Sequence, residues 1–248
     1  MKPELVVQYL VDWLRARVQE AGASGLVLGV SGGVDSAVAA VLAKKAFPDD
    51  CMALLIPCES DISDRIDSQT LVEKFNIRYR IIEMDNAYRL LATQFESYLK
   101  FDGAKGRLLR GNIKSRLRMM ALYYSALGRN YLVLGTSNKS EISVGYATKY
   151  GDGGVDIQVL GDLFKREVFE LARYLEIPQA IIDKPPSGGL WCGQTDEAEL
   201  GFTYVELDKY LSTGVAEPEL KQSIEKRMKS SEHKRTMPPL AIIPEQLK

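Results

Sequence analysis

The stretch Leu26-Val27-Leu28-Gly29-Val30-Ser31-Gly32-Gly33-Val34-Asp35-Ser36, continued by a helix-forming run to Ala46, decides the fold. Its first five residues form a short, almost wholly apolar run, which is typical of a buried strand. The glycine pair ends that strand, and residues 35–46 are rich in residues that favour a helix. The stretch therefore predicts a strand, a tight loop and a helix in direct succession.

The loop at residues 31–36 is suited to binding phosphate. At such a position backbone N–H groups and the positive end of the following helix face an anion, and the two glycines allow close approach. Ser31 and Ser36 offer hydroxyl donors, whereas Asp35 beside a phosphate favours a cation between the two and is a candidate Mg²⁺ ligand. The alternative is a simple glycine turn with a capping Ser or Asp, but the strand–loop–helix context favours phosphate.

The residue pattern of this loop indicates the family to which it is similar. The Gly-Lys-Ser/Thr ending of Walker loops is absent, and Ser31–Ser36 resembles the loop of the ATP pyrophosphatase family. Members of that family cleave ATP between the α and β phosphates, so the resemblance implies that the loop holds the pyrophosphate part of ATP. The implied ATP-binding residues of this region are Gly29, Val30, Ser31, Gly32, Gly33, Val34, Asp35 and Ser36.

Outward from the loop, strands and helices alternate along the chain. Further strands are expected at Met52–Ile56, Tyr79–Ile82 and Tyr131–Leu134, and helices at 4–20, 64–75, 86–99, 111–127, 163–175, 203–211 and 217–230. This alternation predicts an α/β fold, a parallel twisted sheet with helices on both faces, in one domain over residues 1–248. Segments 101–110 and 184–195 resist assignment, and as glycine-containing loops they are expected to be lids.

Composition excludes several classes of protein. Lys and Arg total 32 against 33 Asp and Glu, and this balance argues against a nucleic-acid binder. No apolar run reaches the roughly 18 residues of a membrane-spanning helix, and the amphipathic N-terminus carries Asp12, unlike a signal peptide. Cys51, Cys58 and Cys192 are an odd number without close pairing, which predicts neither a disulfide framework nor a zinc site. We therefore expect a cytoplasmic protein.

Motifs beyond the phosphate loop point to one branch of the superfamily. They are Gly111–Arg118 (GNIKSRLR), Gly135–Glu141 (GTSNKSE), Gly145–Asp156 (GYATKYGDGGVD), Lys184–Ser187 (KPPS) and Glu232–Arg235 (EHKR), and they span nearly the whole chain. In this order they resemble the NAD synthetase family. The resemblance implies a ligase that makes NAD from deamido-NAD, ATP and ammonia through an acyl adenylate, releasing AMP and pyrophosphate with Mg²⁺ as the metal.

The resemblance also assigns ATP and metal contacts. Thr136 and Glu141 follow the strand at 131–135, so they share the ligand-facing edge with the phosphate loop, and Glu141 would bind Mg²⁺ together with Asp35. Without the resemblance, Glu141 reads as a carboxylate near a helix start. Lys165 lies in a first helical turn, where a cation is unfavourable unless an anion faces it, and the family places ATP phosphates there. Ser187 resembles the residue that contacts the leaving phosphates.

A second set of residues matches the dinucleotide site of the family. Asn112 and Arg116 are one helical turn apart and share a face, whereas Tyr146 either stacks on the pyridine ring or packs in the core. The C-terminal pair His233-Lys234 has a solvated tail as its alternative. The implied deamido-NAD-binding residues are Asn112, Arg116, Tyr146, Lys149, Asp156, His233 and Lys234.

The donor and the assembly are expected from the same resemblance. The phosphate loop begins at Ser31, which leaves no room upstream for a glutaminase domain, so free ammonia is the expected donor. The family works as a homodimer, and the apolar helix at 111–127 suits either an interface or a core. The rivals are a tRNA-thiolating enzyme, which would need catalytic cysteines and a basic surface, and a nucleotide-binding module without chemistry.

Overall fold

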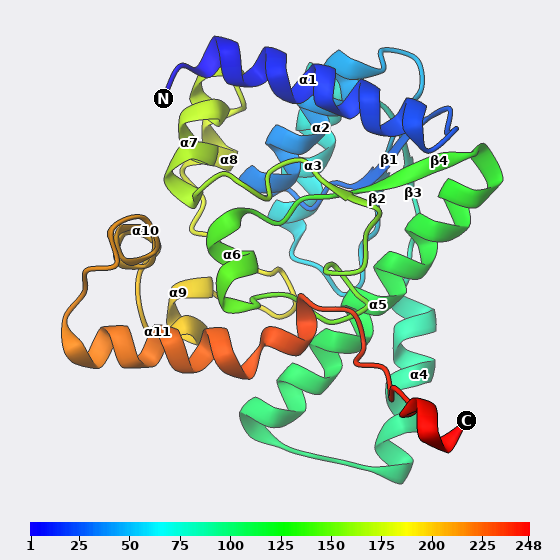
Figure 1. Cartoon of the computed structure of the whole chain (residues 1–248). Coiled ribbons are helices and arrows are strands. Elements are labelled where there is room, and N and C mark those ends of the chain that lie inside the picture. The colour runs from blue at the N-terminus through cyan, green and yellow to red at the C-terminus, as the bar shows by residue number, and fades with distance from the viewer.

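The computed structural model describes residues 1–248, and a five-stranded parallel sheet forms its centre (Figure 1). The strands are β1 (Gly25–Gly29), β2 (Cys51–Leu55), β3 (Arg78–Ile81), β4 (Tyr131–Gly135) and β5 (Ile157–Gln158). Their order is β3-β2-β1-β4-β5, and every neighbouring pair is parallel. The predicted α/β class is confirmed.

Helices cover both faces of this sheet. The longer ones are α1 (Pro3–Glu20), α2 (Val34–Ala46), α3 (Ile62–Lys74), α4 (Asp85–Tyr98), α5 (Gly103–Arg129), α7 (Lys165–Tyr174), α10 (Tyr204–Thr213) and α11 (Pro218–Ser230). Short helices are α6 (Lys139–Val144), α8 (Gln179–Ile182) and α9 (Asp196–Leu200). None of the helices is long and apolar enough to cross a membrane.

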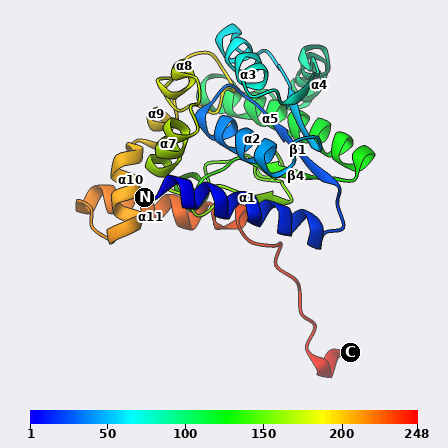
Figure 2. The same cartoon turned by 90° about the horizontal axis from the view of Figure 1, so that it is seen from above.

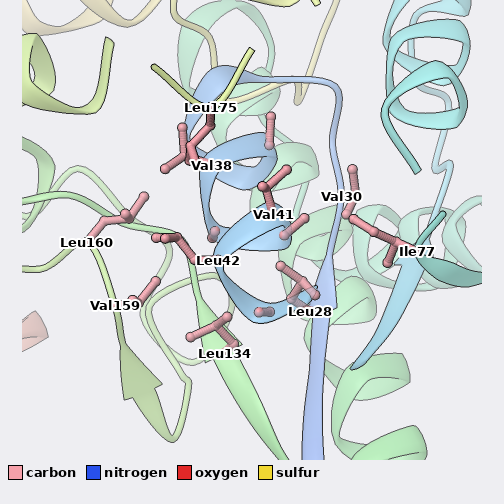
Figure 3. Packing of buried hydrophobic residues seen from close by; sticks show 14 of the residues in the cluster. Leu28, Val30, Val38, Val41, Leu42, Ile77, Leu134, Val159, Leu160 and Leu175 are labelled. Carbon is pink, nitrogen blue, oxygen red and sulfur yellow. The ribbon is translucent and has the colours of Figure 1, made fainter. Parts of the chain in front are cut away.

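Alternation along β1 explains the two-sided core. Leu26 and Leu28 join α1, α2, α3 and α7 in the larger cluster of buried residues, whereas Val27 joins α5 on the other face. This is the period of two that a strand imposes on its side chains. Figure 3 shows Leu28 packing beside Leu42 of α2 and Leu134 of β4. The core thus holds the carboxyl ends of β1 and β4 side by side.

The helices after residue 196 form an appendage with a separate small core. Leu200, Phe202, Leu207 and Ile224 pack with Val144 of α6, away from the main sheet. A one-turn 3-10 helix at Glu232–Lys234 follows α11, and the chain then runs out as a tail that leaves the body of the molecule (Figure 2). The appendage therefore meets the sheet domain through α6 and α7.

One expected lid is wrong. Residues 103–110 are not a loop but the first two turns of α5, which begins at Gly103. Gly103 has φ of +64°, and at Gly106 an added Cβ would lie 2.1 Å from the carbonyl oxygen of Phe101. The two glycines allow the tight turn that leads into the helix. Because glycine disfavours helices, their presence led to the prediction of a loop over these residues. Segment 183–195, by contrast, contains no helix or strand, as expected for residues 184–195.

Candidate functional site

The site lies where β1 and β4, neighbours in the sheet, end. The phosphate loop follows β1, and residues 136–138 follow β4, so the two loops face each other at the carboxyl edge. This is the edge at which open α/β sheets bind ligands. The side-chain amide of Asn138 donates to Asp35 Oδ1 at 2.8 Å and joins the two loops directly.

Hydrogen bonds within the phosphate loop hold its shape. The hydroxyl oxygens of Ser31 and Ser36 are 3.1 Å apart, and Ser36 Oγ also accepts from the Ser31 N–H at 3.2 Å. Gly32 has φ of +85°, and a Cβ there would lie 2.6 Å from the carbonyl oxygen of Asp64. Only glycine fits this position without displacing α3. Helix α2 begins at Val34, so its unpaired first N–H groups open toward the same edge.

A buried lysine lies between the two predicted metal ligands. Lys165 Nζ is 2.6 Å from Asp35 Oδ2 and 2.9 Å from Glu141 Oε1. The lysine is only 2% exposed, and it reaches the acids from the first turn of α7. Asp35, Glu141 and Lys165, all predicted from the sequence, therefore meet at one point. In this arrangement the two acids bind the lysine, where the prediction has them bind Mg²⁺.

Buried polar groups hold the start of α7 in place. The Lys165 N–H donates to Ser140 Oγ at 3.0 Å, and the Arg166 N–H donates to Asp208 Oδ2 at 3.1 Å. Asp208 is 1% exposed and also accepts a short hydrogen bond from the Ser140 hydroxyl. A carboxylate at a helix N-terminus is favourable, so Asp208 offsets the cost of a lysine at this end of α7.

Charge and burial shift the pKa values of this cluster. Burial raises the pKa of Glu141, and Lys165 offsets this only in part. Burial alone would lower the pKa of Lys165, but the attraction of Asp35 and Glu141 outweighs it and raises that pKa. The lysine therefore stays charged between two carboxyl groups, one of which is favoured in its protonated form by burial.

The donor set fits Mg²⁺ as a pair of carboxylates whose metal shell water or a substrate completes. No group of three or more His, Cys, Asp or Glu side chains could hold a metal ion. Magnesium in nucleotide sites, however, commonly takes one or two carboxylates and completes its shell with phosphate oxygens and water. Asp35 and Glu141, on either side of the opening of the phosphate loop, supply such a pair.

Two residues of this cluster were missed from the sequence. The Tyr204 hydroxyl donates to Asp196 Oδ2 at 2.8 Å and lies 3.3 Å from Glu141 Oε1. The ring of Tyr204 also lies under Lys165, with Nζ 4.7 Å from its centre. Asp196 is 3% exposed, and its other oxygen, Oδ1, is buried without a hydrogen-bond partner. Nothing in the local pattern around residue 196 indicates a buried carboxylate.

Several predicted dinucleotide residues come together on α5 and the 145–149 segment. Asn112 Oδ1 accepts from the Thr148 hydroxyl at 2.9 Å, and Arg116 Nε donates to the Lys149 carbonyl at 3.3 Å. Lys149 Nζ in turn donates to the carbonyl of His233 at 2.6 Å. Lys234 binds the same segment, because its Nζ donates to the carbonyls of residues 145 and 147. The C-terminal turn is therefore docked and is not a free solvated tail.

Two predicted residues lie elsewhere. The Tyr146 hydroxyl donates to Glu199 Oε2 at 2.8 Å, and its ring packs against the small core of the appendage, which favours the core alternative. Asp156 accepts from the Val133 N–H at 2.7 Å and from the Tyr123 hydroxyl at 3.0 Å, beside the start of β5. Both oxygens of Asp156 are thus engaged within the chain.

The remaining predicted ATP contacts border the cluster. Thr136 directly follows β4 and is half-buried at the ligand-facing edge. Ser187 is exposed in segment 183–195, where its hydroxyl accepts from the Gly189 N–H at 3.1 Å. Lys184 ties this segment to α3, since its Nζ is 2.9 Å from Asp64 Oδ1 and also pairs with Asp67.

Comparisons with known proteins show the family of the chain. The family model described as NAD synthase matches residues 6–238. Over 248 residues, all of both chains, the sequence is 70% identical to the NH(3)-dependent NAD(+) synthetase of Syntrophomonas wolfei. Among solved structures, the NMN synthetase from Francisella tularensis has a TM-score of 0.90 at 40% identity, with 99% of each chain covered. The NH3-dependent NAD synthetase from Campylobacter jejuni has a TM-score of 0.80 at 30% identity, covering 98% of this chain and 100% of that one. The chain belongs to the NAD synthase family.

Proposed function

We propose that the cluster of Asp35, Glu141 and Lys165 beside the phosphate loop is the place where this chain activates its substrate. The reaction is the ATP-dependent amidation of deamido-NAD with ammonia, which makes the chain a ligase of NAD biosynthesis. The observation that carries the location is the buried lysine, 2.6 Å and 2.9 Å from two carboxylates at the sheet edge. Burying these three charges costs free energy that even good pairing repays only in part, and a hydrophobic core would not need them.

The first step brings two anions together. The nicotinate carboxylate attacks the α-phosphate of ATP, the bond to the pyrophosphate breaks, and an acyl adenylate forms. In this proposal the loop N–H groups of residues 31–36, with Lys165, neutralise the phosphates and hold them in line. Mg²⁺ held by Asp35 and Glu141 supplies further positive charge when it is bound. Thr136 and Ser187 contact the nucleotide from the edges of the site.

The second step needs an ordered acceptor and a dry site. Ammonia attacks the acyl carbon of the adenylate, AMP leaves with the electrons of the broken bond, and the nitrogen loses one proton to solvent to give the neutral amide. Segment 184–195 is proposed to close over the adenylate and to keep water from it. No side chain has to form a covalent intermediate, and the single histidine, exposed at position 233, agrees with this. Free ammonia serves as the donor, with the whole chain as one synthetase domain.

The dinucleotide is proposed to lie along the docked C-terminal turn. Asn112 and Arg116 share one face of α5, and their bonds to Thr148 and to the Lys149 carbonyl join this face to the segment that carries Lys149. Lys149 in turn binds the carbonyl of His233, next to Lys234. Arg116 is exposed and reaches only a backbone carbonyl at 3.3 Å, so its guanidinium can pair with a substrate phosphate. Tyr146, whose hydroxyl binds Glu199, would hold the 145–149 segment in place against the appendage.

A homodimer is proposed from an apolar face on α5. Met120 is 61%, Tyr124 85% and Leu127 88% exposed, on a helix whose other side is buried. Large exposed apolar side chains at helical spacing often belong to an interface. Asp156 lies close to this face through its bond with Tyr123, so a second subunit could complete a substrate site there. A cytoplasmic location is proposed separately, because all three cysteines of the chain are free thiols.

A second candidate substrate is nicotinate mononucleotide. The Francisella tularensis structure with a TM-score of 0.90 is that of an NMN synthetase. The same activation chemistry serves both acids, because each carries the same nicotinate carboxylate. The ratio of kcat/KM for the two substrates decides between them.

The test measures pyrophosphate release by the purified chain with ATP, Mg²⁺, ammonium and either deamido-NAD or nicotinate mononucleotide. We expect release to depend on one of the two acids and to match the amide formed. Asp35→Asn should nearly abolish turnover, whereas Asp162→Asn should not, because Asp162 has a side chain that is 97% exposed. ATP binding without pyrophosphate release, whichever acid is added, would refute the proposal and favour a nucleotide sensor.

A further inference from the structure

Beyond the residues already assigned, the buried carboxylate of Asp196 has an oxygen with no partner. The side chain is 3% exposed, and its Oδ2 accepts from the Tyr204 hydroxyl at 2.8 Å. Its Oδ1 is enclosed without a hydrogen-bond partner, because the neighbouring Tyr146 hydroxyl donates its one proton to Glu199. Leaving a charged oxygen unpaired in a protein interior costs free energy. Such an atom needs a donor, and a group that arrives in another state of the enzyme can supply one.

The partner that best fits this oxygen is the ammonium of Lys165. The lysine lies over the Tyr204 ring at 4.7 Å, and that tyrosine bonds to Asp196 on one side and approaches Glu141 at 3.3 Å on the other. An ammonium has three donors, and Lys165 Nζ donates to Asp35 and to Glu141. If a metal ion takes the carboxylates of Asp35 and Glu141 as ligands, the lysine loses both of its present hydrogen-bond acceptors.

We propose that Asp196 is a positioning residue that takes up Lys165 when Mg²⁺ and the nucleotide occupy the site. This role rests on the proposed function, since it assumes that Asp35 and Glu141 hold the metal. Asp196 then holds the ammonium from behind through Oδ1, and the remaining donors of Lys165 face the phosphates. Without Asp196, the lysine stays on Asp35 and Glu141 and competes with the metal for them.

The backbone around Asp196 adds a second consequence. The Asp196 N–H donates to the carbonyl of Pro186 at 3.0 Å, next to Ser187, and the nearby Gln194 accepts from the Leu190 N–H at 2.8 Å. The same residue therefore contacts both the lysine cluster and the segment proposed to close over ATP. A movement of Asp196 toward a new partner would therefore also move Pro186, through this hydrogen bond.

The test measures binding and does not depend on turnover. The probe is an ATP analogue with a methylene group between the α and β phosphates, titrated by calorimetry at increasing Mg²⁺ concentration. Asp196→Asn keeps the size but removes the charge, and we expect it to raise the Mg²⁺ concentration for half-saturation about tenfold, the loss expected for one charge-assisted hydrogen bond. The Kd for deamido-NAD, measured by the same calorimetry, should stay unchanged, which a general loss of structure would not allow.

The matched control is Glu197→Gln, the same kind of change at the next residue. Glu197 is exposed, and its Oε1 accepts from the Tyr204 N–H at 2.9 Å, which an amide oxygen can also do. We expect this variant to bind the analogue with the Mg²⁺ dependence of the wild type. If Asp196→Asn also matches the wild type, Asp196 has no role in positioning Lys165.

A crystal structure of the wild-type chain with Mg²⁺ and the analogue decides the matter even if Asp196→Asn does not fold. We expect Lys165 Nζ to lie about 3 Å from Asp196 Oδ1. A lysine still bonded only to Asp35 and Glu141 would overturn the inference, with the proposed function intact. Wild-type chain that does not bind the analogue with Mg²⁺ would refute both.

Discussion

Replacing Lys165 by methionine isolates the energetics of the buried cluster. The lysine side chain is 3% exposed, and its partners Asp35 and Glu141 are 17% and 12% exposed. Removing one member of a buried ion pair costs about 3–5 kcal/mol of unfolding free energy. Because both acids keep some contact with solvent, we expect about 3 kcal/mol, near the lower end of that range.

The loss should depend on pH and on magnesium. Burial already raises the pKa of Glu141, and without Lys165 the strongest opposing influence is gone. A carboxyl group that binds its proton more tightly in the folded state destabilises the fold as pH rises. The variant should therefore lose more stability in mildly alkaline than in mildly acidic buffer. If the two freed acids bind Mg²⁺ as proposed, the metal should stabilise the variant more than the wild type.

Urea unfolding followed by circular dichroism, with EDTA or with millimolar Mg²⁺, measures these effects. The matched control is Lys139→Met, because Lys139 pairs at 2.8 Å with the exposed Asp162 and such surface pairs contribute less than about 1 kcal/mol. Equal losses for the two variants would refute the reasoning. So would an added stability from Mg²⁺ that is no larger in Lys165→Met than in the wild type.

Three further predictions concern other parts of the chain. Arg116→Ala should raise the Kd for deamido-NAD at least about tenfold, the worth of a charge-assisted phosphate contact, and leave that for ATP nearly unchanged by calorimetry; equal losses would remove Arg116 from the dinucleotide site. Gly32→Ala places a Cβ 2.6 Å from the Asp64 carbonyl at φ of +85°, so we expect a loss of about 1–3 kcal/mol in thermal unfolding, together with lost nucleotide binding; a variant with wild-type Tm would contradict this. Only Cys192 is exposed among the three free thiols, so a thiol reagent should label the native chain once and the unfolded chain three times, and faster second labelling would show that a buried thiol is accessible.

The sheet and its site edge could be predicted because their signals are local. An apolar run followed by two glycines and a helix-forming segment predicts β1, its loop and α2, and these lie at 25–29 and 34–46. The residues that follow β4 were placed on the same edge by the rule for parallel strands, and the bond from Asn138 to Asp35 confirms that they meet. The family resemblance added residue assignments that periodicity alone does not contain.

What could not be predicted depends on contacts distant in sequence. Asp196 and Tyr204 reach Lys165 only because the appendage folds back against α7, and no pattern near residue 196 contains that information. The first turns of α5 were hidden by glycines that make a tight turn with Phe101. The short elements α6, α8, α9 and β5 have too few residues for a hydrophobic period to appear.

Asp64 gives two separate loops a common support. Its backbone lies against Gly32, and its carboxylate pairs with Lys184 at 2.9 Å, at the base of segment 183–195. If the loop holds the triphosphate and segment 184–195 closes over it, as proposed, a small shift of α3 would displace both of them together. We therefore expect nucleotide binding and closure of this segment to be coupled through α3, so that substitutions on α3 that touch no substrate change the rate of product release.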